Sequence, residues 1–423
     1  MKNTDNFQSQ KLEESFLKRL TLLCGKESFR PKLDHIRDFL SQDRRVIEAR
    51  SKVIIVGGTN GKGETSHSLS YLYERAGFTS CLWTSPHVLS ITERFKLNEK
   101  NISIEELTEL LDENEEVIKS LKLSFYEALF VLFIKFALKH ETDFVILEVG
   151  LGGRFDVTNI FTRPITAITS IGLDHTEILG NTLKEILFEK YGITRFGGKL
   201  FENIEQTFLK DILSQWCERD DITLTSVSKQ SDLPYFERNR QMAVALFEES
   251  TQQSLDKDSL KKIEWPLTPG RWDSMLVGDR EFVFVGAHNQ LGHKVLLKSI
   301  SDCQGKESFD VLMSFSTGRE DQISSTIKLY NTYPCIIKSV NILSFQHERA
   351  LSKETLQQNL KTGTKVYEIH DFLDTILSTN EEIDTEKQSN IESLRSGSNK
   401  LLVVGSYYFI ACMQKYLRTK YSK

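Results

Sequence analysis

A glycine-rich segment, Gly58–Thr65, lies between a short apolar run and a helical pattern. The run Val53–Val56 is typical of a buried strand, and apolar positions repeat at helical spacing from Leu69 to Ala76. A strand, a glycine turn and a helix in this order let backbone N–H groups approach an anion at the helix N-terminus. The segment therefore predicts a phosphate-binding loop in which Lys62 reaches the terminal phosphates of a nucleotide. The alternative is a glycine-rich turn with a lysine at the surface.

Two more predicted strands end in polar side chains that suit a magnesium site. Phe144–Leu147 is followed at once by Glu148. Ile165–Ile171 leads to Asp174 and His175. Parallel strands present their carboxyl ends at one edge of a sheet, where ligands of α/β proteins bind. A carboxylate at that edge can hold Mg²⁺, which prefers oxygen ligands. The alternatives are a solvated loop glutamate and a structural histidine.

Lys190 falls on the apolar face of a predicted helix. Thr182 and Glu185 have the spacing of a capping box, which marks a helix start. Lys190 then shares one face with Leu183, Ile186 and Leu187. Desolvation lowers the pKa of a lysine, and a neutral amine can contact phosphate or react with CO₂ to form a carbamate. The alternative is a lysine whose stem runs along apolar surface to solvent.

A second series of strands and helices follows the Pro/Gly-rich stretch Trp265–Gly270. Its predicted strands are Glu281–Val285, Phe309–Met313 and Leu401–Val404. Its predicted helices are Leu291–Ile300, Ile323–Tyr330 and Lys353–Leu360. The sequence thus predicts an α/β protein with a first domain over residues 1–268, a linker over 269–275 and a smaller domain over 276–423.

Composition narrows the class of protein. The 423 residues are 39% hydrophobic and 27% charged, with a net charge of −5, which is typical of a globular protein and argues against pervasive disorder. The charge balance gives no support for nucleic acid or a membrane surface as partner. The six cysteines have no C-x-x-C spacing and indicate reduced thiols. We expect a cytoplasmic enzyme that acts on small molecules as a monomer.

Several segments together resemble folylpolyglutamate synthase and the bifunctional dihydrofolate synthase/folylpolyglutamate synthase of the Mur ligase superfamily. The resemblance runs from about Phe16 to Leu417. The segments that carry it are Gly58–Gly63, Thr84–His87, Glu93-Arg94, Glu148–Asn159, Ser170–Gly180, Glu189–Ile193, Pro269–Arg271, Gly286–Asn289 and Gly405-Ser406.

The resemblance implies a P-loop ATPase domain with a mainly parallel sheet and a smaller, Rossmann-like C-terminal α/β domain. It implies that ATP phosphorylates the carboxylate of a folate, with dihydropteroate as a second candidate acceptor, to give an acyl phosphate. The amine of L-glutamate then attacks, forming an amide and releasing ADP and phosphate. The implied cofactor is Mg²⁺, and ATP is a substrate.

The resemblance also assigns roles to residues of this sequence. The implied magnesium ligands are Ser85, Glu148 and His175. The implied catalytic residues are Lys62, Lys190 (the lysine that is carbamylated in the family), Arg271 and His288. The implied ATP contacts are Thr59, Asn60, Gly61, Lys62, Gly63, Glu64, Thr65, Asn239, Arg271 and Val285. The implied folate or pteroate contacts are Ser124, Phe155, Asp156 and Val157.

Five positions depart from the family pattern. Val285 stands where an aspartate is usual, and Glu64 replaces a small hydroxyl residue of the phosphate loop. Tyr191, Gln290 and Thr92 stand where alanine, proline and arginine are usual. The first two departures lie on the ATP side and predict weakened use of ATP.

Two other functions compete with a folate-directed ligase. The first is a Mur-ligase-type enzyme with a different carboxylate acceptor. The second is a non-catalytic relative that binds a nucleotide or a folate. Retained ATP binding without turnover would favour the second.

Overall fold

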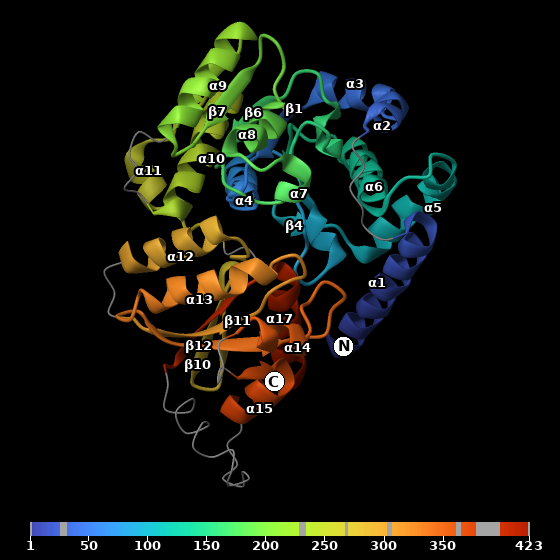
Figure 1. The fold of residues 1–423 in the computed structure, drawn as a ribbon. Coiled ribbons are helices and arrows are strands. Elements are labelled where there is room, and N and C mark those ends of the chain that lie inside the picture. Colours follow the sequence, from blue (N-terminus) through green and yellow to red (C-terminus); the bar gives the residue numbers. More distant parts are fainter. Residues whose placement is uncertain are drawn as a thin grey trace, which may run out of the picture. The chain divides into compact units, whose positions relative to one another are not determined.

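The computed structural model describes residues 2–25, 32–227, 234–266, 270–302, 307–360, 365–377 and 398–421. The chain divides into two compact units, Met1–Pro266 and Leu267–Lys423. Each unit has its own sheet, and both can be followed by colour and label in Figure 1. Within the described residues, no helix combines the length and the apolar composition that crossing a membrane requires.

The sheet of the first unit has the strand order β4-β3-β2-β5-β1-β6-β7-β8. All neighbours from β2 to β8 pair in parallel, and β3 and β4 add an antiparallel edge. The strands are β1 (Lys52–Gly57), β2 (Ser80–Trp83), β3 (Phe95–Leu97), β4 (Lys100–Asn101), β5 (Phe144–Glu148), β6 (Ile165–Ile168), β7 (Lys199–Glu202) and β8 (Thr223–Ser226). Strand β1 lies between β5 and β6, so the three predicted motifs end at one edge.

Helices cover both faces of this sheet because its central strands are apolar on both sides. Ile54 and Val56 face a core shared with α4 and α10, whereas Val53 and Ile55 face the larger core under the other helices. The helices are α1 (Lys2–Cys24), α2 (Asp34–Phe39), α3 (Ser41–Arg50), α4 (Lys62–Arg75), α5 (Ile104–Ser120), α6 (Phe125–His140), α7 (Thr176–Leu179), α8 (Leu183–Tyr191), α9 (Thr207–Arg219), α10 (Tyr235–Thr251) and α11 (Lys257–Lys261), with short 3₁₀ turns η1 (Ile91–Arg94) and η2 (Val157–Ile160).

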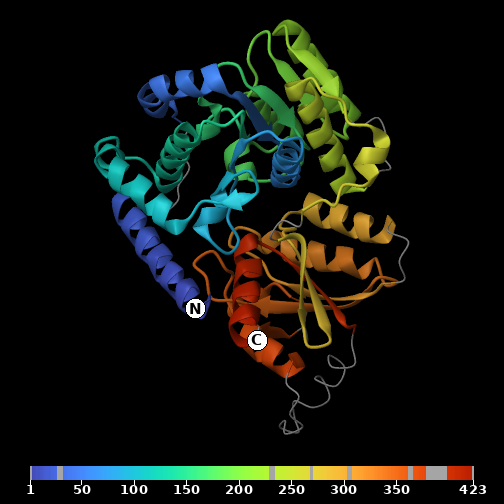
Figure 2. The same ribbon diagram turned by 180° about the vertical axis from the view of Figure 1, so that it is seen from behind.

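The sheet of the second unit has the order β13-β12-β11-β14-β10-β9, parallel except for β9. Its strands are β9 (Arg271–Val277), β10 (Arg280–Val285), β11 (Phe309–Met313), β12 (Ile337–Ser344), β13 (Val366–Glu368) and β14 (Lys400–Val404). Its helices are α12 (Gln290–Asp302), α13 (Ile323–Asn331), α14 (Lys353–Gln358), α15 (Ile369–Leu377) and α17 (Tyr407–Tyr421), with the 3₁₀ turn η3 (Glu320–Gln322). Helices α12 to α14 share a core with one face of the sheet, and Figure 2 shows α17, in red, lying over the strands.

The α/β fold and its predicted central strands are confirmed, but two boundaries differ from prediction. Strand β6 ends at Ile168 rather than Ile171, because the next residues turn to contact the phosphate loop. Residues 271–275, which the sequence predicts as part of the linker, lie in β9. Strand β9 is an edge strand with many half-exposed side chains, so it lacks the apolar run by which strands are recognised. Residue 269 lies outside the described residues.

Candidate active site

The phosphate loop connects β1 to α4 and needs glycine at two positions. Gly58 and Gly61 have φ angles of 141° and 88°, which side chains rarely adopt. A Cβ atom on Gly58 would lie 2.0 Å from Oγ1 of Thr169, and one on Gly61 would lie 2.4 Å from Oδ1 of Asn239. The glycines therefore permit both the turn and the close approach of its neighbours.

The end of β6 holds this loop in place. The Thr169 and Ser170 hydroxyls donate to the carbonyl oxygen of Asn60, at 2.6 and 2.9 Å, and the Ser170 hydroxyl also accepts from the Asn60 N–H. Thr59 is buried, and its hydroxyl exchanges hydrogen bonds with the backbone of Gly172. These contacts fix Thr59 and Asn60 before any ligand binds. Thr169 and Ser170 were not among the predicted site residues, although their place at the end of a predicted strand could have indicated them.

Two lysines converge on one carbonyl oxygen of the loop. Nζ of Lys62 lies 3.0 Å from the oxygen of Gly58 and 3.1 Å from that of Thr59, and Nζ of Lys190 lies 2.9 Å from the oxygen of Gly58. Lys190 is only 4% exposed. Burial, together with the charge of Lys62, lowers the pKa of Lys190 to about 7. The inward orientation predicted for Lys190 is confirmed.

Glu64 and Asn239 contact each other beside the loop. Nδ2 of Asn239, on α10, donates to Oε2 of Glu64 at 2.7 Å, and the Asn239 carbonyl oxygen accepts from the buried hydroxyl of Thr65 at 3.4 Å. Glu64 occupies the first turn of α4, where the helix dipole stabilises its carboxylate. The same carboxylate would repel a phosphate bound at this helix terminus. Gly63, between Lys62 and Glu64, is buried.

Glu148 and Ser85 meet at the ends of the adjacent strands β5 and β2. Glu148 is 2% exposed, and its Oε2 accepts from the backbone N–H of Ser85 at 3.2 Å. The Ser85–Pro86 peptide bond is cis. The loop that carries Ser85 is held by Glu93, whose carboxylate accepts from the N–H groups of residues 88, 89 and 90 at 2.7 to 3.0 Å. The structure therefore brings Ser85 and Glu148 together as predicted partners.

His175 follows β6 at the same edge of the sheet but is more exposed. Its backbone is left-handed, with φ of 48°, and its side chain is 42% exposed. Its ring nitrogens lie 4.0 Å from Asp174 and 3.7 Å from Glu177. In the described part of the chain, no three His, Cys, Asp or Glu side chains form a ready metal cluster. Of the three predicted magnesium ligands, only Glu148 and His175 are of these residue types. The third predicted ligand is the hydroxyl of Ser85.

The residues predicted to contact a folate have different surroundings. Ser124 is the buried N-cap of α6 and forms a capping box with Glu127. Asp156 is buried, accepts from the N–H groups of Gly150 and Leu151, and caps η2 through Thr158. Val157 lies in the main core. Ser124, Asp156 and Val157 thus have structural partners.

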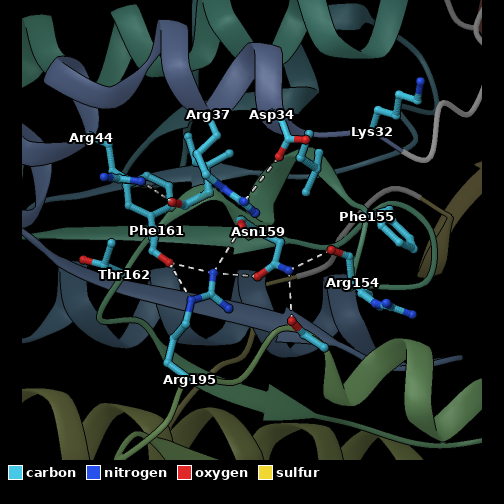
Figure 3. A pocket seen from close by; sticks show the side chains of 13 residues that line it. Lys32, Asp34, Arg37, Arg44, Arg154, Phe155, Asn159, Phe161, Thr162 and Arg195 are labelled. Carbon is cyan, nitrogen blue, oxygen red and sulfur yellow. Dashed lines mark hydrogen bonds and ion pairs between the residues drawn. The ribbon is translucent and has the colours of Figure 1, made fainter.

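Phe155 is half-buried and lines a pocket of about 480 Å³ (Figure 3). The pocket also carries basic side chains, which are Lys32, Arg37, Arg44, Arg154 and Arg195. Arg195 stabilises the wall, because its guanidinium donates to the carbonyl oxygens of Phe161 and Asn159. The sequence patterns gave no sign of this concentration of basic groups.

The second unit places Arg271, Val285 and His288 near one another. Val285 at the end of β10 pairs with Arg271 on β9, and His288 lies three residues further on. The Arg271 and His288 side chains both approach Tyr407, the first residue of α17. Tyr407 was not among the predicted site residues, although it directly follows the Gly405-Ser406 segment.

Three further departures from the family pattern have local structural partners. The Tyr191 hydroxyl lies 3.0 Å from the Trp216 carbonyl oxygen and 2.8 Å from Asp220, which joins α8 to α9. Nε2 of Gln290 donates to Ser325 and Thr326, each at 2.8 Å, which joins α12 to α13. Thr92 lies in η1, where its hydroxyl contacts that of Ser90 at 2.8 Å.

No protein-family model matches the chain. The chain is 28% identical over 411 residues to the dihydrofolate synthase/folylpolyglutamate synthase of Bacillus subtilis, and the alignment covers 88% of this chain and 91% of the relative. The resemblance to folylpolyglutamate synthases that the sequence predicts is thus confirmed over most of the chain.

Two solved structures show that the folylpolyglutamate synthase fold extends over almost the whole chain. Mycobacterium tuberculosis folylpolyglutamate synthase complexed with ADP and AMPPCP gives a TM-score of 0.78 at 20% identity, covering 97% of this chain and 99% of that one. A bifunctional folylpolyglutamate synthase/dihydrofolate synthase with Mn, AMPPNP and L-glutamate bound gives 0.76 at 20% identity, with coverages of 96% and 98%. The predicted fold class is thus confirmed.

Proposed function

We propose that this protein is an ATP-dependent ligase that adds L-glutamate to a reduced folate through an acyl phosphate. The observation that carries the proposal is the rigid phosphate loop, on whose Gly58 oxygen Lys62 and Lys190 converge. The alignment over 91% of a curated dihydrofolate synthase/folylpolyglutamate synthase supports the same activity. A loop of this kind positions a phosphoryl group for transfer, and the proposed acceptor of that group is the carboxylate of a folate.

The residues at the sheet edge fit a divalent cation and ATP. Glu148 supplies a buried carboxylate, and Ser85, whose backbone N–H donates to that carboxylate, would supply a hydroxyl. Oxygen donors of this kind suit Mg²⁺. We assign Ser85, Glu148 and His175 to the cation, which would offset negative charge on the phosphates of ATP. Backbone groups of Thr59 to Gly63 would hold those phosphates.

Each lysine of the loop has a distinct role in the proposal. Lys62 lies at the first position of α4, where its ammonium group stabilises charge on the transferred phosphoryl group. Lys190 is buried and its pKa is lowered to about 7, so a large fraction of its amine is neutral at pH 7 and can form the carbamate that the family resemblance implies. In the second unit, Arg271 and His288 would contact the nucleotide, the phosphoryl group or glutamate.

The pocket lined by Phe155 offers a place for the acceptor. Folates carry at least one carboxylate. The pocket is lined by five basic side chains and one acidic side chain, Asp34, so the net charge of its lining is positive. The aromatic ring of Phe155 can stack on a flat heterocycle. We propose that the first unit binds ATP and the acceptor, that Arg271 and His288 of the second unit contact substrate, and that the protein acts as a cytoplasmic monomer.

ADP release by the purified protein tests this function. Mg·ATP and glutamate are supplied with tetrahydrofolate or with dihydropteroate, and reactions without acceptor serve as controls. We expect ADP release that depends on tetrahydrofolate and on glutamate. Release with both acceptors would show a bifunctional enzyme, whereas silence with both, despite ATP binding, would contradict the proposal.

A further inference from the structure

We propose that Tyr407 is a positioning residue that fixes the direction of Arg271 and the packing of His288. The inference rests on the proposed function, in which those two side chains contact an anionic substrate. Nε of Arg271 donates to the Tyr407 hydroxyl at 3.2 Å, and the guanidinium carbon lies 5.6 Å from the centre of the same ring. The His288 ring lies 6.1 Å from the Tyr407 ring, at an interplanar angle of 55°.

A β-bulge sets where the Arg271 side chain leaves the sheet. Phe284 on β10 pairs with Asp273, whereas Val285, its next residue, pairs with Arg271, so Trp272 is the extra residue of β9. Trp272 has a φ of 68°, which is rare for a bulky side chain. A bulge redirects the neighbouring side chain, and backbone strain of this kind is concentrated at functional sites.

Helix α17 contacts β9 on both sides of this bulge. Tyr407 bonds to Arg271 before the bulge, and Nε2 of Gln414 donates to Oδ2 of Asp273 after it, at 2.6 Å. The other carboxylate oxygen of Asp273 accepts from the N–H of Gly270 at 2.7 Å. Tyr407 and Gln414 are seven residues apart and share a helix face. The helix therefore fixes the strand at two points around Arg271.

The loop after β10 makes room for the Tyr407 ring. A Cβ atom on Gly286 would lie 2.5 Å from two ring carbons of Tyr407. Strands β14, β10 and β9 are neighbours in the sheet, so the start of α17 at Tyr407, the loop with His288 and the start of β9 at Arg271 meet at one edge. Glycine at 286 is thus required by the same contact that fixes the arginine.

This arrangement suits recognition of an anion. A guanidinium group binds carboxylate or phosphate through a planar fork of N–H donors, and its direction decides whether two bonds form at once. The bond to Tyr407 uses Nε and therefore fixes the plane of the guanidinium group. Because the group is planar, the direction of its two terminal nitrogens is fixed as well. The anion is either a phosphate of the nucleotide or a carboxylate of glutamate.

Removing one hydroxyl tests the proposal. Tyr407→Phe keeps the ring against His288 but loses the bond to Arg271. We expect KM to rise about tenfold for either ATP or glutamate, with kcat changed less than threefold. Measuring the two KM values separately identifies which anion Arg271 contacts. Calorimetric binding of a non-hydrolysable ATP analogue and of glutamate should show the same loss of affinity, with an unchanged melting temperature.

Tyr408→Phe is the matched control, because Tyr408 is the next residue of α17 and stacks on His347 with ring centres 4.3 Å apart. It should leave both KM values unchanged. In an Arg271→Lys background, Tyr407→Phe should add no further loss. If Arg271→Lys impairs binding and Tyr407→Phe does not, the inference about Tyr407 is overturned while the proposed role of Arg271 stands. If Arg271→Lys changes nothing, the proposed role of Arg271 fails, and the inference fails with it.

Discussion

Lys190 carries an amine whose pKa is lowered by its surroundings. The side chain is 4% exposed, and burial is the main reason why its pKa falls to about 7. In the unfolded chain the same amine has the ordinary lysine pKa, so between these values the unfolded state binds more protons than the folded state. The free energy of unfolding therefore rises with pH through this interval. Below about pH 7 the amine is charged in both states, and the folded protein is destabilised by the full cost of burying that charge.

Lys190→Met removes that pH dependence. We expect the wild type to gain stability relative to the variant from pH 7 to pH 10, by a total on the order of 3 kcal/mol. Denaturant unfolding of both proteins in CO₂-depleted buffer measures the difference. A difference that stays constant over this range would show that Lys190 is charged in the folded protein.

Glu64 places a negative charge in the first turn of the helix that follows the phosphate loop. We expect Glu64→Ser to lower the KM for ATP about fivefold, because repulsion of roughly 1 kcal/mol between the carboxylate and the phosphates is removed. Glu74→Ser makes the same change near the other end of α4 and should have no effect. Equal KM values for wild type and Glu64→Ser would mean that the bond from Asn239 keeps the carboxylate away from ATP.

The element that organises the proposed cation site is η1 with the loop before it. Glu93 accepts three backbone N–H groups of that loop, and Nε of Arg94 donates to Nδ1 of His87 at 3.0 Å. Burial lowers the pKa of His87 to about 3, so the histidine stays neutral and accepts this bond. Together these contacts hold the loop that carries Ser85 beside Glu148.

Glu93→Ala should loosen this loop. We expect a loss of about 2 kcal/mol in stability, since three N–H groups lose a charged acceptor, and a several-fold higher Mg²⁺ concentration for half-maximal activity. Ser103→Ala removes the N-cap of α5 and should cost about 1 kcal/mol without changing the Mg²⁺ requirement. An unchanged Mg²⁺ requirement in Glu93→Ala would contradict the role of the loop in holding Ser85.

At the scale of the whole molecule, the sequence predicted most of the features that lie within one strand, the loop after it and the next helix. The phosphate loop, the end of β5 and the inward face of α8 follow from local patterns. Local patterns could not predict contacts between segments that are far apart in the sequence. Examples are the hydrogen bonds of Thr169 to Asn60 and of Asn239 to Glu64. Tyr407 was missed for the same reason, because its role depends on the neighbouring order of β14, β10 and β9.

Two predicted folate contacts also have a structural role. The family resemblance implies that Ser124 and Asp156 contact the folate, and both serve as N-caps, of α6 and η2. A capping serine or aspartate has the same sequence pattern whether or not it also meets a ligand. Their contact with a folate remains a prediction.

Transfer of oxygen from the acceptor to phosphate tests the proposed ligase reaction most directly. Tetrahydrofolate is supplied with ¹⁸O in its terminal carboxylates, together with Mg·ATP and glutamate, and the released phosphate is analysed by mass spectrometry. The acyl-phosphate route predicts one ¹⁸O atom in phosphate for each amide bond formed, because the carboxylate oxygen leaves with phosphorus when the amine attacks. Phosphate without label, alongside ADP, would contradict it.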